Sequence, residues 1–237
     1  MMNYALTIGR LFGIQIKLHW SFLFISLVVI YWRIGLDNDW STIGRWCAFL
    51  FATIFCVFLH ELGHALSAKY YGITTEHITL LPIGGMAVLN GLPKKATHEM
   101  VVAFAGPFAN LLIAIVLALY LWLTTEQGIA LIGVEEGLFD YDLNFLQIIF
   151  RINFCLFAFN LFPAYPFDGW RIFRAALSTM MSRLKATRLS IYVSFGLGLT
   201  LLIYGLVMDD KRFMILGIFT LFMIRRAIPL TYERSEV

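Results

Sequence analysis

Charged side chains are scarce in this sequence. They make up 14% of the residues, while 60% are hydrophobic. Soluble domains average about 25% charged and about 45–50% apolar residues, so the shortage excludes an ordinary soluble domain. The sequence also lacks a basic stripe of the kind that binds nucleic acid, and we expect no nucleic-acid partner. The remaining class is a membrane protein that lies in a lipid bilayer.

Cysteines and flexible linkers are scarce as well. The three cysteines, Cys47, Cys56 and Cys155, show no C-x-x-C spacing, which argues against a disulfide framework or a cysteine-ligated metal. No Pro/Ser-rich hinge, low-complexity tract or internal repeat divides the chain. We therefore expect a single domain over residues 1–237, with its core at about 43–171.

Long apolar runs are what the sequence has in abundance. Six of them can be assigned to helices that cross a bilayer, which need roughly 20 residues each; they lie at residues 18–34, 43–66, 100–124, 145–163, 189–207 and 213–224. The first is longer than the apolar part of a cleavable signal peptide, so we expect it to be an anchor. The sequence predicts an all-α polytopic membrane protein with about six transmembrane helices.

The charged residues that are present are distributed unevenly. With six spans, most of the 18 lysines and arginines fall on the side that holds the N-terminus, and the acidic segment 126–142 falls on the other side. Positively charged loops stay in the cytoplasm. We therefore expect a multi-pass protein of the cell membrane with both termini in the cytoplasm.

Two short segments on the cytoplasmic side have the pattern of strands. In residues 12–19, apolar and polar residues alternate. In residues 72–91, β-branched and apolar residues flank a Pro-x-Gly-Gly turn signal. We expect a small sheet or hairpin at the cytoplasmic membrane surface, with irregular interfacial loops as the alternative.

The second apolar run ends in the sequence HELGH, residues 60–64. Ionisable groups are costly in hydrocarbon and are found mostly where they pair or act. On a helix, His60 and His64 lie about one turn apart on the same face and can chelate one metal ion. Glu61, between them in sequence, can act as a general base toward water at a zinc ion. The spacing therefore predicts a catalytic metal site.

A catalytic zinc ion needs a third protein ligand, and the candidate is Asp168. It follows the fourth apolar run, where Pro163 and Pro166 are expected to end the helix and Gly169 to let the chain turn. The second and fourth runs cross in the same direction, so the two histidines and Asp168 reach the same leaflet. We expect the active site near the cytoplasmic leaflet.

Together these motifs resemble the signature of the site-2 proteases, which are intramembrane zinc metalloproteases. The matching patterns are His60-Glu61-x-x-His64 and Asn160-x-x-Pro163-x-x-Pro166-x-Asp168-Gly169, with weaker matches at Gly84-Gly85 and Ala105-Gly106-Pro107-x-x-Asn110. The resemblance extends from the first span to about Arg171. The short loops are similar to those of the simpler prokaryotic members, so we expect neither a PDZ module nor a CBS pair.

The resemblance implies a set of residue roles. It implies Glu61 as general base and acid and one zinc ion held by His60, His64 and Asp168. It also implies that Asn160 contacts substrate or steadies the oxyanion, and that Gly84 and Gly85 belong to the substrate-binding region. The implied reaction is regulated intramembrane proteolysis, the hydrolysis of peptide bonds within or near transmembrane segments. The implied substrates are transmembrane proteins such as membrane-anchored transcription factors or anti-sigma factors.

A further hypothesis concerns the way in which a substrate binds. A peptide bond in an intact helix is shielded, so we hypothesise that the substrate unwinds and adds as a strand to the hairpin at 74–89.

Two other function classes are the alternatives to a protease. A metal transporter would need its polar groups near the bilayer midplane, often in two repeats, whereas here they gather at one leaflet. A catalytically silent scaffold that binds transmembrane helices would need neither Glu61 nor both histidines.

Overall fold

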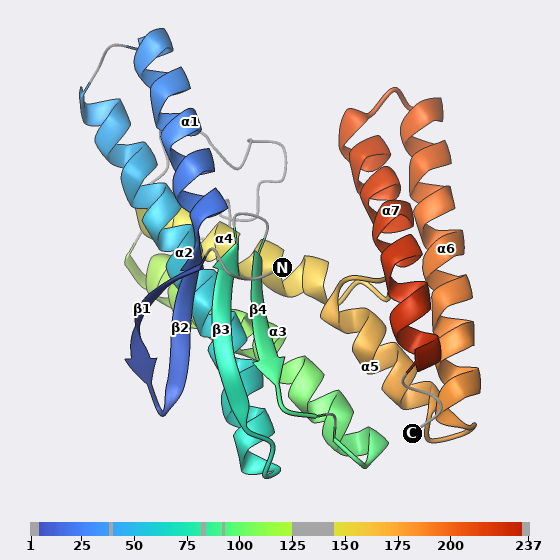
Figure 1. Ribbon diagram of the computed structural model, residues 1–237. Coiled ribbons are helices and arrows are strands. Elements are labelled where there is room, and N and C mark those ends of the chain that lie inside the picture. The colour runs from blue at the N-terminus through green and yellow to red at the C-terminus, as the bar shows by residue number, and fades with distance from the viewer. Residues whose placement is uncertain (1–4, 38–39, 82–83, 92, 125–144, 234–237) are drawn as a thin grey trace. The chain divides into compact units, whose positions relative to one another are not determined.

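The computed structural model describes residues 5–37, 40–81, 84–91, 93–124 and 145–233 (Figure 1). Most of them are helical, and four strands form one small sheet. The elements in chain order are β1 (Ala5–Leu11), β2 (Ile14–His19), α1 (Trp20–Asp37), α2 (Trp40–Tyr70), β3 (Thr75–Leu81), β4 (Gly84–Leu89), α3 (Ala96–Thr124), α4 (Phe145–Asn160), α5 (Asp168–Leu177), α6 (Arg183–Val207) and α7 (Lys211–Glu233). The acidic segment 126–142, which we expect outside the membrane, lies outside the described residues.

Each of the six expected apolar runs overlaps one helix. Among the described residues, three helices are long and apolar enough to cross a bilayer: Gly44–Tyr70 within α2, Ala96–Thr124 in α3 and Arg183–Val207 in α6. Helix α4 is apolar but shorter, with 16 residues. The structure therefore supports a helical membrane protein with three candidate spans by length and composition.

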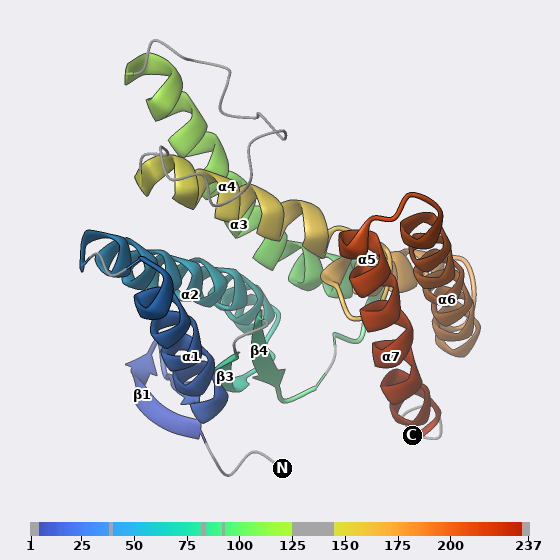
Figure 2. The same ribbon diagram turned by 90° about the horizontal axis from the view of Figure 1, so that it is seen from above.

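The chain divides into two compact units. The first unit contains Met1–Leu92 and Ala105–Phe157, and the second contains Pro93–Phe104 and Ala158–Val237. The first unit thus holds the sheet, α1, α2, most of α3 and most of α4. The second unit holds the first turns of α3 together with α5, α6 and α7. Helices α6 and α7 lie side by side in both views (Figure 1, Figure 2).

The sheet of the first unit has the strand order β1-β2-β3-β4. Strands β2 and β3 pair in parallel, while β1–β2 and β3–β4 are antiparallel hairpins. The expected strand at 12–19 and the expected hairpin at 72–91 are confirmed as β2 and as β3–β4, whose turn at 82–83 lies outside the described residues. Strand β1 was not predicted from the sequence.

Helix α2 covers the sheet through an apolar core. Ala65 on α2 packs with Ile14 of β2 and with Ile78 and Leu80 of β3, and all four side chains are buried. These residues alternate with polar ones along each strand, so one face of the sheet turns toward the helix. The packing fixes the sheet beside the last turns of α2, where the HELGH motif lies.

Candidate metal centre

His60 and His64 lie on one face of α2 with their rings directed toward the same point. Both side chains are buried, and their Nε2 atoms are 3.1 Å apart. Two nitrogens that each lie about 2.0–2.1 Å from one tetrahedral zinc ion would be separated by about 3.3 Å. The pair therefore fits two ligands of a single metal ion, as the spacing in the sequence predicts.

Gly106 on α3 makes room for these two rings. A Cβ atom at position 106 would lie 2.2 Å from His64 Nε2 and 2.8 Å from His60 Nε2. Gly63 plays the matching part on α2, because a Cβ there would lie 2.6 Å from the carbonyl oxygen of Ala105. The two glycines therefore let α2 and α3 pack closely and still leave space for the two imidazole rings.

Glu61 lies against the backbone of β4. Its Oε2 accepts a hydrogen bond from the Ala87 N–H at 2.9 Å. A Cβ atom at Gly85 would lie 2.7 Å from Glu61 Oε1, so only glycine fits there without a shift. Gly84 has φ of +136°, a conformation that favours glycine. Gly85 thus lets the Glu61 carboxyl group lie directly against β4, and Gly84 supplies the backbone conformation beside it.

Two asparagines of the first unit, on α3 and α4, form a chain of hydrogen bonds that ends at His60. His60 Nδ1 lies 2.6 Å from Asn110 Oδ1 on α3. The Asn110 side-chain amide donates to Asn153 Oδ1 on α4 at 2.7 Å. Both asparagines are fully buried. Asn153 thereby connects α4 to the metal-binding face of α2, a link that no local sequence pattern predicts, because the three side chains come from three different helices.

Asp168 belongs to the second unit, where it is the first residue of α5. Its side chain is buried, and Arg171 Nη1 lies 3.6 Å from its Oδ1. The expected turn at Gly169 is wrong, because this residue lies inside α5. A Cβ there would lie 2.3 Å from the carbonyl oxygen of Leu161, so glycine is needed for close packing. Helix N-termini favour negative charge, so the first position of α5 suits the Asp168 carboxylate.

Asn160, the other site residue predicted in this part of the chain, is the last residue of α4.

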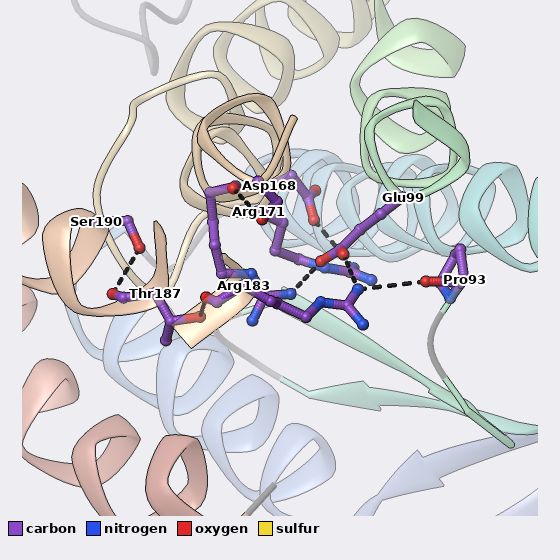
Figure 3. A network of polar contacts seen from close by, with 9 residues as sticks. Pro93, Glu99, Asp168, Arg171, Arg183, Thr187 and Ser190 are labelled. Carbon is purple, nitrogen blue, oxygen red and sulfur yellow. Dashed lines mark hydrogen bonds and ion pairs between the residues drawn. The ribbon is translucent and has the colours of Figure 1, made fainter. Parts of the chain in front are cut away.

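A network of ion pairs around a buried carboxylate ties α5 to its neighbours in the second unit (Figure 3). The Glu99 carboxylate is 1% exposed and pairs with Arg174 of α5 and Arg183 of α6. Arg183 also donates to the carbonyl of Pro93 at 3.2 Å, and Arg174 lies over the Trp170 ring at 4.8 Å. Glu99 therefore lies at the centre of this network.

The donor set of His60, His64 and Asp168 is compatible with a single zinc ion. Two imidazoles and one carboxylate are typical protein ligands of catalytic zinc, and all three side chains are buried. The structure brings the two histidines together within the first unit and describes Asp168 within the second. Glu61 lies beside the histidines and does not belong to this donor set.

Comparisons with known proteins agree with these motifs. The model of peptidase family M50 matches residues 48–141 and 138–203. A zinc metalloprotease of Methanocaldococcus jannaschii is 34% identical over 224 residues, which make up 93% of this chain and 60% of that protein. Stage IV sporulation protein FB of Bacillus subtilis is 28% identical over 146 residues, or 61% of this chain and 46% of that protein.

A solved structure is also similar. The site-2 protease from Methanocaldococcus jannaschii matches with a TM-score of 0.65 and 32% sequence identity, over 94% of each chain. By contrast, the chain spans only about half of the length of the curated relatives, between 46% and 60% for the two named above. The structural match therefore concerns nearly the whole chain, while the curated relatives contain further sequence.

Proposed function

The chain belongs to peptidase family M50, and we propose that it is an intramembrane zinc metalloprotease that hydrolyses peptide bonds within or near transmembrane segments. One observation carries the proposal. The two Nε2 atoms of His60 and His64 converge at 3.1 Å on an apolar helix long enough to cross a bilayer, with Glu61 held beside them. Hydrolytic chemistry inside a membrane accounts for this costly set of groups.

In this proposal His60, His64 and Asp168 hold one zinc ion. When bound, zinc supplies Lewis-acid polarisation of the scissile carbonyl and activation of water. Asp168 is supported as the third ligand by its burial and by its place at the N-terminus of α5. Glu61 accepts a proton from the attacking water and returns it to the leaving amine. The Ala87 N–H fixes the position of the Glu61 carboxylate for this transfer.

The substrate adds as an extended strand to the β3–β4 hairpin at residues 74–89. Among the described strands, β4 lies at an edge of the sheet, and its backbone contacts Glu61 at Ala87. A peptide that pairs with this edge would gain main-chain hydrogen bonds next to the base. Gly84 and Gly85 lie on this strand and belong to the substrate-binding region, and Asn160 contacts the substrate or steadies the oxyanion.

The proposal also includes the topology and the class of substrate. Six helices span the cell membrane, both termini lie in the cytoplasm, and the sheet and active site lie near the cytoplasmic leaflet. The distribution of lysine and arginine supports this orientation. Residues 1–237 act as one protease domain on transmembrane proteins, such as membrane-anchored transcription factors or anti-sigma factors.

The test compares the wild type with Glu61→Gln in reconstituted membranes, using a panel of single-span proteins as substrates and measuring bound zinc in parallel. We expect about one zinc per chain in both proteins and a loss of cleavage of about 10²–10⁴-fold in the variant, the range for removal of a general acid or base. Equal cleavage by both would contradict the role of Glu61. Absence of zinc from both would favour the silent scaffold.

A further inference from the structure

The buried amides of Asn110 and Asn153 lie in two apolar helices. Polar groups in such surroundings are costly unless they are hydrogen-bonded. Both side chains are fully buried, and each makes contacts with other helices: Asn110 on α3 with His60 of α2, and Asn153 on α4 with Asn110 and with Cys56 of α2. Their contacts end at a nitrogen of a proposed zinc ligand.

We propose that Asn110 and Asn153 form a positioning relay that holds His60 in the tautomer with the proton on Nδ1 and the metal-binding lone pair on Nε2. This inference rests on the proposed zinc site and concerns its preparation before the metal binds. The two asparagines are positioning residues, since they act on the metal only through His60.

The polarity of the relay is set by a backbone carbonyl. The Asn153 side chain donates from Nδ2 to the carbonyl oxygen of Ile149 at 2.9 Å. A carbonyl oxygen only accepts hydrogen bonds. The amide nitrogen of Asn153 must therefore face Ile149, and its oxygen must face away from it. The assignment of the two ends of this amide follows from the contact itself and not from the appearance of the side chain.

Each following contact inherits this direction. Asn153 Oδ1 can only accept, so the Asn110 amide nitrogen must face it and donate, as the 2.7 Å contact requires. Asn110 Oδ1 then faces His60 Nδ1 at 2.6 Å and also can only accept. The proton of a neutral His60 must therefore lie on Nδ1. Nε2, the atom that approaches His64 Nε2, is left with the lone pair.

The contact with Cys56 is consistent with this polarity. The second N–H of the Asn153 amide points to Cys56 Sγ at 3.1 Å. Both N–H groups of Asn153 are thus used, and its oxygen remains for Asn110. Sulfur is a weak acceptor. The Ile149 carbonyl therefore determines which way the Asn153 amide faces, and the Cys56 thiol accepts its second N–H.

The relay should influence metal affinity through preorganisation. A ligating histidine typically donates its other N–H to an acceptor that fixes its tautomer and ring orientation, and removal of such an acceptor usually lowers metal affinity by about 10–100-fold. Here the acceptor is a neutral amide and not the carboxylate often found in that place. A neutral relay suits a helix core in which an unpaired charge would be costly.

The test uses purified full-length protein in detergent and two readouts. Zinc affinity is measured by competition with a chromophoric chelator, and the tautomer of His60 is measured by nitrogen-15 NMR of zinc-free, histidine-labelled protein at about pH 8.5, where an ordinary imidazole is neutral. The variants are Asn110→Leu and Asn153→Leu. Thr220→Val is the matched control, because it removes another fully buried polar group, on α7 in the second unit.

We expect Asn110→Leu to weaken zinc binding by about 10–100-fold and to shift His60 away from the Nδ1–H tautomer. Asn153→Leu should also produce a mixture of tautomers, because Asn110 can then turn its nitrogen toward His60. Asn110→Asp, which keeps an accepting oxygen opposite His60 Nδ1, should retain the tautomer. Thr220→Val should change neither readout.

The relay is overturned if His60 keeps the Nδ1–H tautomer in both leucine variants, whatever their stability. It is also overturned if zinc affinity in Asn110→Leu stays within about threefold of the wild type, a change well below that expected for a lost orienting contact. The tautomer is measured without metal. Failure of the wild type to bind zinc would contradict the proposed function and would still leave the relay open to this measurement.

Discussion

The two units hold their functional side chains by different kinds of polar contact. In the first unit, neutral amides on α3 and α4 hold His60. In the second unit, the helix that begins with Asp168 is α5. The buried carboxylate of Glu99 holds this helix through an ion pair with Arg174 of α5. His60 is thus in contact with neutral amides, whereas the helix that begins with Asp168 is anchored by full charges.

The difference follows from the cost of burial. A hydrogen-bonded amide can be placed in an apolar helix core at moderate cost, whereas a buried charge needs an opposite charge and further hydrogen bonds. Arg183, the second partner of Glu99, keeps 46% of its side chain exposed and so remains partly solvated. Substitutions in the ion-pair network of the second unit should therefore lower mainly the stability of the fold. Substitutions beside His60 should lower mainly the affinity for zinc.

The largest effect on stability is expected from Glu99→Gln. The substitution keeps the shape of the side chain but leaves Arg174, whose side chain is 12% exposed, without its counter-charge. Breaking a buried ion pair on one side costs about 3–5 kcal/mol. Burial already lowers the pKa of the Arg174 guanidinium, although Glu99 acts in the opposite direction. Denaturation in detergent measures the loss.

Glu76→Gln is the matched control for this prediction. Glu76 also lies near a basic side chain, 3.3 Å from His77 Nδ1, but it is 60% exposed. Surface substitutions of this kind usually change stability by no more than about 0.5 kcal/mol. If the two variants lose the same stability, the buried network has no special role and the contrast between the units fails.

Gly106→Ala should damage the metal site with a smaller effect on folding. The new Cβ would lie within 3 Å of both Nε2 atoms, and such overpacking costs about 1–3 kcal/mol. If that cost is paid by displacing the imidazoles, zinc affinity falls by about 5–150-fold. Metal competition measures it. Gly196→Ala on α6 is the control, since no atom lies within 4 Å of a Cβ there. Unchanged zinc affinity in Gly106→Ala would contradict the account.

Gly85→Ala should separate catalysis from metal binding. Its Cβ would press on the carboxyl group of Glu61 and not on the histidines. We expect zinc to remain bound while cleavage falls by about tenfold or more, because misplacement of a catalytic group by about 1 Å can cost up to about 10²-fold. Zinc content and turnover are measured on the same preparation. Loss of zinc with loss of cleavage would show that β4 supports the whole centre and not the base alone.

The smallest effect is expected at a surface ion pair in the second unit. Hydrogen bonds from the side chain and backbone of Arg212 lower the pKa of Asp210 from 3.8 to about 2. Since the folded-state pKa is the lower one, this contact stabilises the fold above about pH 3.8 and is lost as the pH falls toward 2. The melting temperatures of wild type and Asp210→Asn should therefore differ slightly at neutral pH and converge in acid. A constant difference would exclude this ion pair as its cause.

Local patterns in the sequence were sufficient to predict much of the fold and the centre of the site. The motif on α2 combines two histidines at helical spacing with a glutamate, and this combination has few other uses. Alternation and a turn signal predicted β2 and the β3–β4 hairpin. Strand β1 was missed because nearly all of its side chains are exposed, so it shows no buried face in the sequence pattern.

The remaining features depend on contacts between distant residues. Glu99 lies 75 residues from Arg174 and 84 from Arg183, and the relay joins side chains from α2, α3 and α4. Spacing along the chain cannot reveal such partners. Helix α5 was not predicted, because Pro163 and Pro166 indicate the end of α4 and carry no signal for a helix that follows. The next helix begins two residues after Pro166, at Asp168.

The central claim is a single zinc ion on His60, His64 and Asp168, and X-ray absorption at the zinc edge of the purified protein tests it most directly. The account predicts one zinc per chain with two imidazole nitrogens and carboxylate oxygen at about 2.0–2.2 Å, and loss of the carboxylate contribution in Asp168→Ala. A sulfur neighbour at about 2.3 Å, or a spectrum unchanged by Asp168→Ala, would contradict it.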